Sequence, residues 1–148
     1  MSDKFELYGL DNNLVGDCVD LFIETFSNEP WNDIYESRNQ VYKFFKNHMN
    51  NNYFIGYVLK NKSNVIALSI GMKKPWIHGM EYYIDQFCVK LDMQGQGIGS
   101  QFLKMIEADI KSKGMNAIIL NTEKGFPSEM FYLKNGFKSL DELIILAK

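Results

Sequence analysis

The chain has 148 residues, 46% of them hydrophobic, which is enough for one core of ordinary size and predicts a single domain over residues 1–148. The formal net charge of -2 excludes a broad nucleic-acid footprint, because that mode of binding needs clustered positive charge. No apolar run approaches the ~20 residues of a membrane span, and residues 1–10 lack the regions of a secretion signal. We therefore expect a cytoplasmic protein with a small-molecule partner and with neither nucleic acid nor membrane as a partner.

The first part of the chain predicts a short strand and two helices. Residues 1–8 are the candidate strand, and apolar residues then recur at helical spacing over 14–26 and again over 34–48. His48 lies on the apolar face of the second helix, so we interpret it as a packing residue. His78 is interpreted as a solvated loop residue.

The middle of the chain predicts strands. Residues 53–59 and 65–71 are rich in β-branched and aromatic side chains and predict an antiparallel hairpin. Residues 73–79 predict a loop, and residues 81–89 predict a longer strand that leads into a glycine-rich run.

The second half predicts a βαβ unit followed by a closing segment. A helix begins at the glycines and ends at Gly114, and the short apolar segment 117–120 predicts a central buried strand parallel to the strand 81–89. Pro127 can begin a fourth helix that Gly136 ends, and residues 137–147 supply one or two closing strands. The fold class is α/β, with a mixed sheet.

The run from Gln94 to Ser100 predicts an anion site, because it joins a strand to a helix and contains three glycines in five positions. The first helical turn offers N–H groups without intrahelical partners, at the positive end of the helix dipole. Phosphate or pyrophosphate is the expected guest. A P-loop is excluded because no Gly-Lys-Ser/Thr ending follows, and Phe102 stands where a dinucleotide fingerprint has its third glycine.

Two motifs carry a resemblance to a known family. Gln94, Gly97 and Gly99 fit the Q/R-x-x-G-x-G/A signature of the GNAT superfamily of N-acetyltransferases, and residues 132–137 resemble its Y-x-x-x-G-F ending. The chain is thus similar to a small, bacterial-type, single-domain member. The resemblance implies a mostly antiparallel mixed sheet with one parallel pair and about four helices, and acetyl-CoA as the donor.

The resemblance also implies which residues bind the donor. The end of the strand 81–89 would present backbone groups to the pantetheine arm, and the amides of the glycine run would hold the pyrophosphate. Many relatives carry an Asn before the motif tyrosine where this chain has Gly125, so Asn121 or Thr122, at the end of the short apolar strand, is a substitute candidate. The resulting donor-binding set is Phe87, Cys88, Val89, Gln94, Gly95, Gln96, Gly97, Ile98, Gly99, Ser100, Asn121 and Tyr132.

Tyr132 occupies the position of the family's tyrosine and is the candidate general acid, because a phenol is protonated at neutral pH. The candidate bases are Asp85 and Glu81, which alternation along the strand places on one face with Tyr83 and Phe87. A water-assisted route without a base is the alternative.

The acceptor site is implied only by analogy with relatives, with Trp31, Asp33 and Tyr83 as its candidate residues. Acidic groups beside aromatics suit a cationic amine, and an aminoglycoside-like or polyamine-like small molecule is the expected acceptor. A non-catalytic acyl-CoA-binding module and a peptide or protein amine acetyltransferase are the alternatives. Residues 140–147 could pair two copies in a homodimer, although closure of the core explains them more simply.

Overall fold

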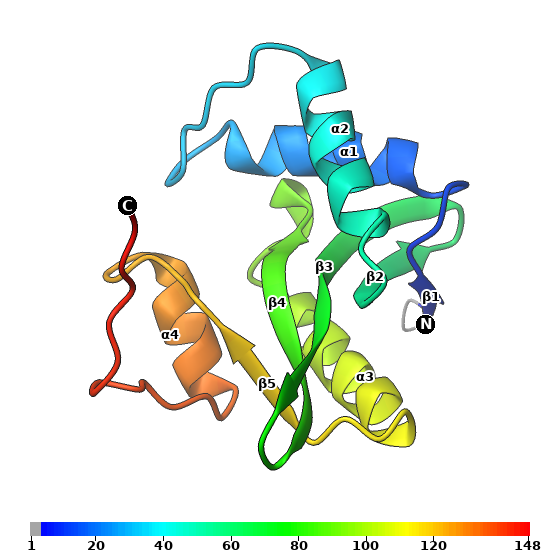
Figure 1. The fold of residues 1–148 in the computed structure, drawn as a ribbon. Coiled ribbons are helices and arrows are strands. Elements are labelled where there is room, and N and C mark those ends of the chain that lie inside the picture. Colours follow the sequence, from blue (N-terminus) through cyan, green and yellow to red (C-terminus); the bar gives the residue numbers. More distant parts are fainter. Residues whose placement is uncertain (1–3) are drawn as a thin grey trace.

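The computed structural model describes residues 4–148 and contains one five-stranded mixed sheet with helices on both of its faces (Figure 1). The part of the first predicted strand that falls on residues 1–3 lies outside the described residues. None of the helices in the described range is long and apolar enough to cross a bilayer. In chain order the elements are β1 (Phe5–Gly9), α1 (Val15–Phe26), α2 (Arg38–Met49), β2 (Phe54–Asn61), β3 (Asn64–Trp76), β4 (Gly79–Val89), the 3-10 turn η1 (Leu91–Met93), α3 (Ile98–Ser112), β5 (Ala117–Leu120) and α4 (Pro127–Lys134).

The strands lie in the order β1-β2-β3-β4-β5, and each neighbouring pair is antiparallel except β4 and β5. The parallel pair is the βαβ unit that the sequence predicts, because α3 carries the chain back from the end of β4 to the start of β5. The fold class and the parallel pairing are therefore confirmed. The position of β5 is different from the prediction: it is half-buried and forms the edge of the sheet instead of a central strand.

Two apolar clusters hold the helices to the sheet. One joins α1 and α2 to one face and contains Phe22, Phe45 and Cys88, and the other joins α3 to the opposite face and contains Tyr82 and Phe102. Phe45 and Phe102 are completely buried, so full burial of each contributes about 1.5–3 kcal/mol.

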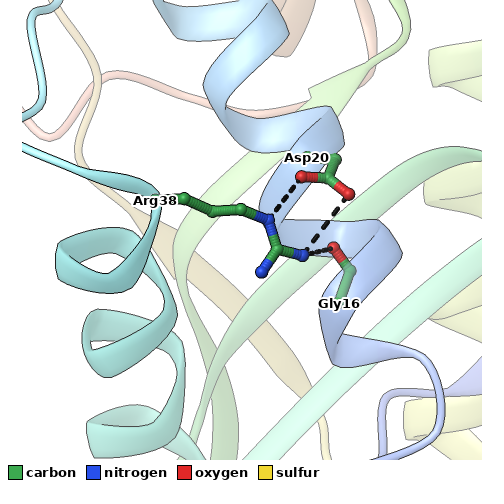
Figure 2. Close-up of polar contacts among 3 residues, drawn as sticks. All are labelled: Gly16, Asp20 and Arg38. Carbon is green, nitrogen blue, oxygen red and sulfur yellow. Dashed lines mark hydrogen bonds and ion pairs between the residues drawn. The ribbon is translucent and has the colours of Figure 1, made fainter.

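A single arginine joins α1 to α2 (Figure 2). The Arg38 guanidinium donates through Nε to Asp20 Oδ1 at 2.8 Å and through Nη2 to the Gly16 carbonyl at 3.1 Å. Both charged side chains are more than half exposed, so the ion pair itself is weak, and the contact mainly sets how the two helices lie against each other.

The second helix and the β3–β4 loop differ from their predicted bounds. The α2 helix begins only after Ser37, whose hydroxyl accepts from the Gln40 N–H at 3.1 Å, and Ile34 lies outside it with 95% exposure. The β3 strand continues to Trp76, which pairs with Gly79, so the predicted loop over 73–79 is mostly strand.

The predicted closing strands are absent from residues 137–147, which form no strand in the structure. Side chains from Leu143 to Leu146 are 66–82% exposed, and the segment leaves α4 without joining the sheet (Figure 1). A strand needs a neighbouring strand for its N–H and C=O groups, and this segment has none within residues 4–148. The free edge of β5 stays open as a result.

A β-bulge distorts β4 at its centre. Ile70 pairs with Gln86 and the next residue, Gly71, pairs with Ile84, so Asp85 is an extra residue with no partner on β3. Gly71 permits this arrangement, because a Cβ atom there would lie 1.8 Å from the Tyr83 carbonyl oxygen.

Gly71→Ala should therefore lower the free energy of unfolding by about 3 kcal/mol, the upper end of the cost of overpacking, because the added methyl group meets backbone. Gly9→Ala is the matched strand-glycine control, since a Cβ there has nothing within 4 Å, and it should change stability by less than about 0.5 kcal/mol. Urea unfolding of both variants measures the difference, and equal stabilities would contradict the bulge geometry.

Candidate active site

The site begins where β4 and β5 stop pairing. The parallel register ends at Ile84 with Leu120, and β4 then continues through Asp85–Val89 alongside β3 alone. Within residues 4–148 no strand pairs with this edge of β4, so its N–H and C=O groups are open to an extended ligand, apart from the Val89 carbonyl, which accepts from the Gln94 side chain. In Figure 1 the end of β5 leans away from β4 and toward α4.

The bulge changes which side chains face which helices. Alternation predicts Asp85 and Phe87 on one face of the sheet, and this is wrong. Asp85 contacts His48 on α2, whereas the Phe87 ring stacks on Phe102 of α3 with ring centroids 5.3 Å apart. The extra residue shifts the alternation by one position, so Asp85 and Phe87 lie on opposite faces.

The glycine run forms a tight loop between η1 and α3. Gly95 and Gly97 have φ of 77° and 79°, a left-handed conformation that favours glycine. The Gln94 side chain donates to the Val89 carbonyl at 2.9 Å and so ties the loop to the end of β4. The motif glutamine therefore positions the loop through its side chain.

The start of α3 can hold an anion. Its N-cap is Gly97, which has no side chain to accept from the amides of Ile98, Gly99 and Ser100. A Cβ atom at Gly99 would lie 3.0 Å from the Phe131 ring, so this glycine lets α4 approach the first turn of α3. Free amides at a helix start beside a glycine loop fit a pyrophosphate group.

Tyr132 faces β4 from α4. Its ring lies 6.1 Å from that of Phe87 and 5.3 Å from that of Phe137, and the residue is 9% exposed. Burial raises the pKa of the phenol, with a further contribution from nearby Cys88, so the hydroxyl stays protonated at neutral pH. The arrangement places a protonated hydrogen-bond donor beside the free edge of β4.

His48 and Asp85 form a pair that the sequence did not predict. His48 Nε2 donates to Asp85 Oδ2 at 2.9 Å, and Gln86 donates to the same oxygen at 3.3 Å. The hydrogen bond from His48 holds the pKa of the Asp85 carboxyl below its usual range, although partial burial acts in the opposite direction. The helical spacing of His48 indicated that it faces the sheet, but only the bulge brings Asp85 to it.

Glu81 is apart from this pair. It lies four residues before Asp85 on β4, a separation of about 13 Å in a strand, and it is 6% exposed. Lys74 Nζ donates to Glu81 Oε1 at 3.1 Å, so this carboxylate already has a charged partner. The structure does not bring the two candidate bases together.

The predicted acceptor residues come from two places in the fold, Tyr83 from β4 and both Trp31 and Asp33 from the connection between α1 and α2. Asn121 Nδ2 donates to the Tyr83 hydroxyl at 3.0 Å and so links the end of β5 to β4. The Trp31 ring lies 4.8 Å from that of Phe126, which brings the α1–α2 connection against the start of α4. Asp33 is exposed and accepts from the Tyr35 hydroxyl at 3.3 Å.

Both cysteines, Cys18 and Cys88, are buried free thiols. Burial raises the pKa of the Cys88 thiol to about 12, although its hydrogen bond with Thr25 lowers it, and it raises that of Cys18 to about 12 as well. Cys88 is therefore a poor nucleophile despite its position on β4. Among residues 4–148 there is no group of three or more His, Cys, Asp or Glu side chains placed to hold a metal ion.

Comparison with solved structures gives several matches over nearly the whole chain. The aminoglycoside N-acetyltransferase AAC(6')-Iy in complex with CoA has a TM-score of 0.77 at 10% identity, covering 100% of this chain and 97% of that chain. The aminoglycoside acetyltransferase meta-AAC0020 from an uncultured soil metagenomic sample, in complex with sisomicin, has a TM-score of 0.72 at 15% identity, covering 97% and 94%. A transcriptional regulator from Bacillus halodurans C-125 has a TM-score of 0.77 at 19% identity, covering 98% and 100%. At these identities the matches show the fold alone.

Comparison with curated proteins gives no match. The model of the family described as "Acetyltransferase (GNAT) family" matches residues 16–137, which is most of the chain and includes the β4 edge, the glycine loop and Tyr132. The chain belongs to the acetyltransferase (GNAT) family.

Proposed function

We propose that this protein is an acetyl-CoA-dependent N-acetyltransferase that acts on a primary amine of a small molecule, aminoglycoside-like or polyamine-like. The observation that carries the proposal is the opening between β4 and β5, which begins where their pairing ends at Ile84. The amides of the glycine loop border it on one side and Tyr132 borders it on the other. AAC(6')-Iy, which shares the fold, is described in complex with CoA, and this supports the choice of donor.

The donor would be held mainly by backbone. The amides of residues 94–100 would bind the pyrophosphate, and the free edge of Asp85–Val89 would pair with the amide groups of the pantetheine arm. Asn121 would border the arm from the end of β5. Acetyl-CoA supplies the thioester carbon that the amine nitrogen attacks.

Tyr132 would stabilise the departing sulfur. As the C–N bond forms and the C–S bond breaks, negative charge develops on the sulfur, and the phenol donates a hydrogen bond and then a proton to it. Because the pKa of the phenol is raised, complete transfer of its proton to the sulfur is uphill early in the reaction. The first contribution of Tyr132 is therefore the hydrogen bond.

The acceptor would enter from the α1–α2 side of the sheet. Asp85 lies on that face, Tyr83 is hydrogen-bonded to Asn121 at the end of β5, and Trp31 and Asp33 would border the entrance. Carboxylates beside aromatic rings suit a cationic amine. Sisomicin, the ligand described with meta-AAC0020, supports an amino sugar as one acceptor to test.

A non-catalytic acyl-CoA-binding module is the second candidate. Gly125, with φ of 84°, stands where many relatives have an Asn, and a protein with the same fold is described as a transcriptional regulator. Acetylation of a peptide or protein amine is the third.

The deciding experiment is a screen for release of free thiol from acetyl-CoA with polyamines, aminoglycosides and peptide N-termini as acceptors. We expect turnover with a small-molecule amine, and Tyr132→Phe should lower kcat by about 10²-fold with little change in the Kd for CoA. Tyr8→Phe, an exposed tyrosine of β1, is the matched control.

Turnover only with peptides would favour the third candidate. Tight binding of CoA in calorimetry without turnover of any amine would favour the second candidate, and absence of CoA binding would contradict all three. An unchanged kcat in Tyr132→Phe would remove the role of Tyr132 alone.

We also propose that the protein forms a homodimer through Leu143–Leu146, which we name the tail. Each copy offers an exposed apolar tail and an open β5 edge. Within one copy, residues of the tail and of β5 line the same groove, which has a volume of about 1330 Å³. The tail of one copy would lie beside β5 of the other copy and pair with its unpaired N–H and C=O groups. Two-fold symmetry repeats this pairing, so the β5 edges of both copies would be covered. The buried free thiols of Cys18 and Cys88 support a reducing compartment such as the cytoplasm.

Light scattering at micromolar concentration should therefore give the mass of a dimer. Ile144→Lys/Ile145→Lys places charge on both faces of the extended tail and should give a monomer. Ile77→Lys, which alters an isoleucine that is 95% exposed in the β3–β4 loop, is the control and should stay dimeric. A monomeric wild type would contradict this assembly.

A further inference from the structure

The contact between His48 and Asp85 joins the end of α2 to the centre of the site. His48 is one residue before the last residue of α2, and its Nε2 donates to Asp85 Oδ2 at 2.9 Å. The histidine side chain is 24% exposed and the aspartate side chain 30% exposed, so solvent reaches both. The pair is half-buried and still accessible.

The orientation of the imidazole is fixed from both sides. Its ring packs edge-on against Phe44, with centroids 4.9 Å apart, and its Nε2 is held by the carboxylate. Within residues 4–148 no hydrogen bond uses Nδ1, and this atom is not among the buried polar atoms that lack a partner. With Nε2 carrying the proton, Nδ1 of the neutral ring has an accessible lone pair.

The position of the pair follows from the bulge. Asp85 is the extra residue of β4 and also the first residue after the last β4–β5 pair, so the imidazole is held beside the point where the strands separate. Asp85 and Phe87 are two residues apart, about 7 Å along a strand, but they face opposite sides of the sheet. An amine that enters from the α2 side would meet His48, whereas the departing sulfur would meet Tyr132.

Proton affinity favours the imidazole over the carboxylate as the base. An alkylammonium ion has a pKa of about 10.4, so transfer of its proton to an ordinary imidazole is uphill by about four powers of ten. Transfer to Asp85, whose pKa lies below the ordinary aspartate value, is uphill by more than six. A carboxylate that is already hydrogen-bonded is better suited to orient a base than to act as one.

We propose that His48 accepts the proton of the acceptor amine at Nδ1 and that Asp85 is a positioning residue that orients the imidazole. This inference rests on the proposed function. The ammonium N–H bond breaks, its electron pair stays on nitrogen, and the proton moves to Nδ1. The free amine then attacks the thioester carbon, the C–S electron pair leaves with sulfur, and Tyr132 supplies a proton to the sulfur. The attacking nitrogen loses its second proton as the amide forms, and this proton returns through solvent to the Tyr132 phenolate. His48 returns its proton to solvent.

The test measures thiol release from acetyl-CoA with the amine that the wild type acetylates. His48→Gln should lower kcat by about 10²-fold, the usual contribution of a positioned base, with the Kd for acetyl-CoA unchanged. Asp85→Asn should lower kcat by about 10-fold. His78→Gln, which alters the only other histidine in the chain, is the matched control and should keep wild-type activity.

A chemical rescue separates proton transfer from a structural role. His48→Ala leaves space beside Asp85, and imidazole added to this variant should restore kcat at least 10-fold, which a packing role would not produce. A kcat of His48→Gln within threefold of the wild-type kcat would overturn the assignment. A loss of kcat in His48→Ala that imidazole does not restore, together with a lower melting temperature of that variant, would also overturn it. If the wild type acetylates no amine, the result contradicts the proposed function. The role of His48 as the base is contradicted by itself only when the wild type is active and the His48 variants give the results above.

Discussion

The end of the pairing between β4 and β5 is the constraint on which the rest of the site depends. The two strands pair over four residues each, and β4 then continues for five residues with one free edge. That edge would be costly if it were buried without partners, because each unpaired N–H or C=O group away from water costs about 1–3 kcal/mol. The glycine loop, Phe87 and Tyr132 are all placed around it.

The parts of the site that depend on local sequence were predictable. The left-handed glycines, the start of α3 and the start of α4 at Pro127 follow from preferences of neighbouring residues, and the structure has each of them. The prediction that Asp85 and Phe87 share a face was wrong, because one extra residue shifts the alternation of β4. Gly71, an isolated glycine in a strand pattern, was the available signal for that bulge. Without it, His48 could be placed on the apolar face of α2 but not beside a carboxylate.

The tail shows a different limit of sequence reasoning. Its apolar, β-branched residues favour a strand, but a strand exists only with a partner, and composition does not say whether the partner is the same chain. Here the tail is exposed and the β5 edge is open, so the segment that was expected to close the core is available for a second copy. The parallel pairing of β5 with β4 was therefore predictable, whereas its place at the edge of the sheet was not.

Backbone amide NMR during a titration with acetyl-CoA tests the central claim most directly, because it reports on the free edge of β4 and the glycine loop without requiring turnover. The account predicts shifts over residues 85–89 and 94–101, with little change in the second half of α3 or in β1. Shifts confined to the groove between β5 and the tail, or no shifts at all, would contradict it.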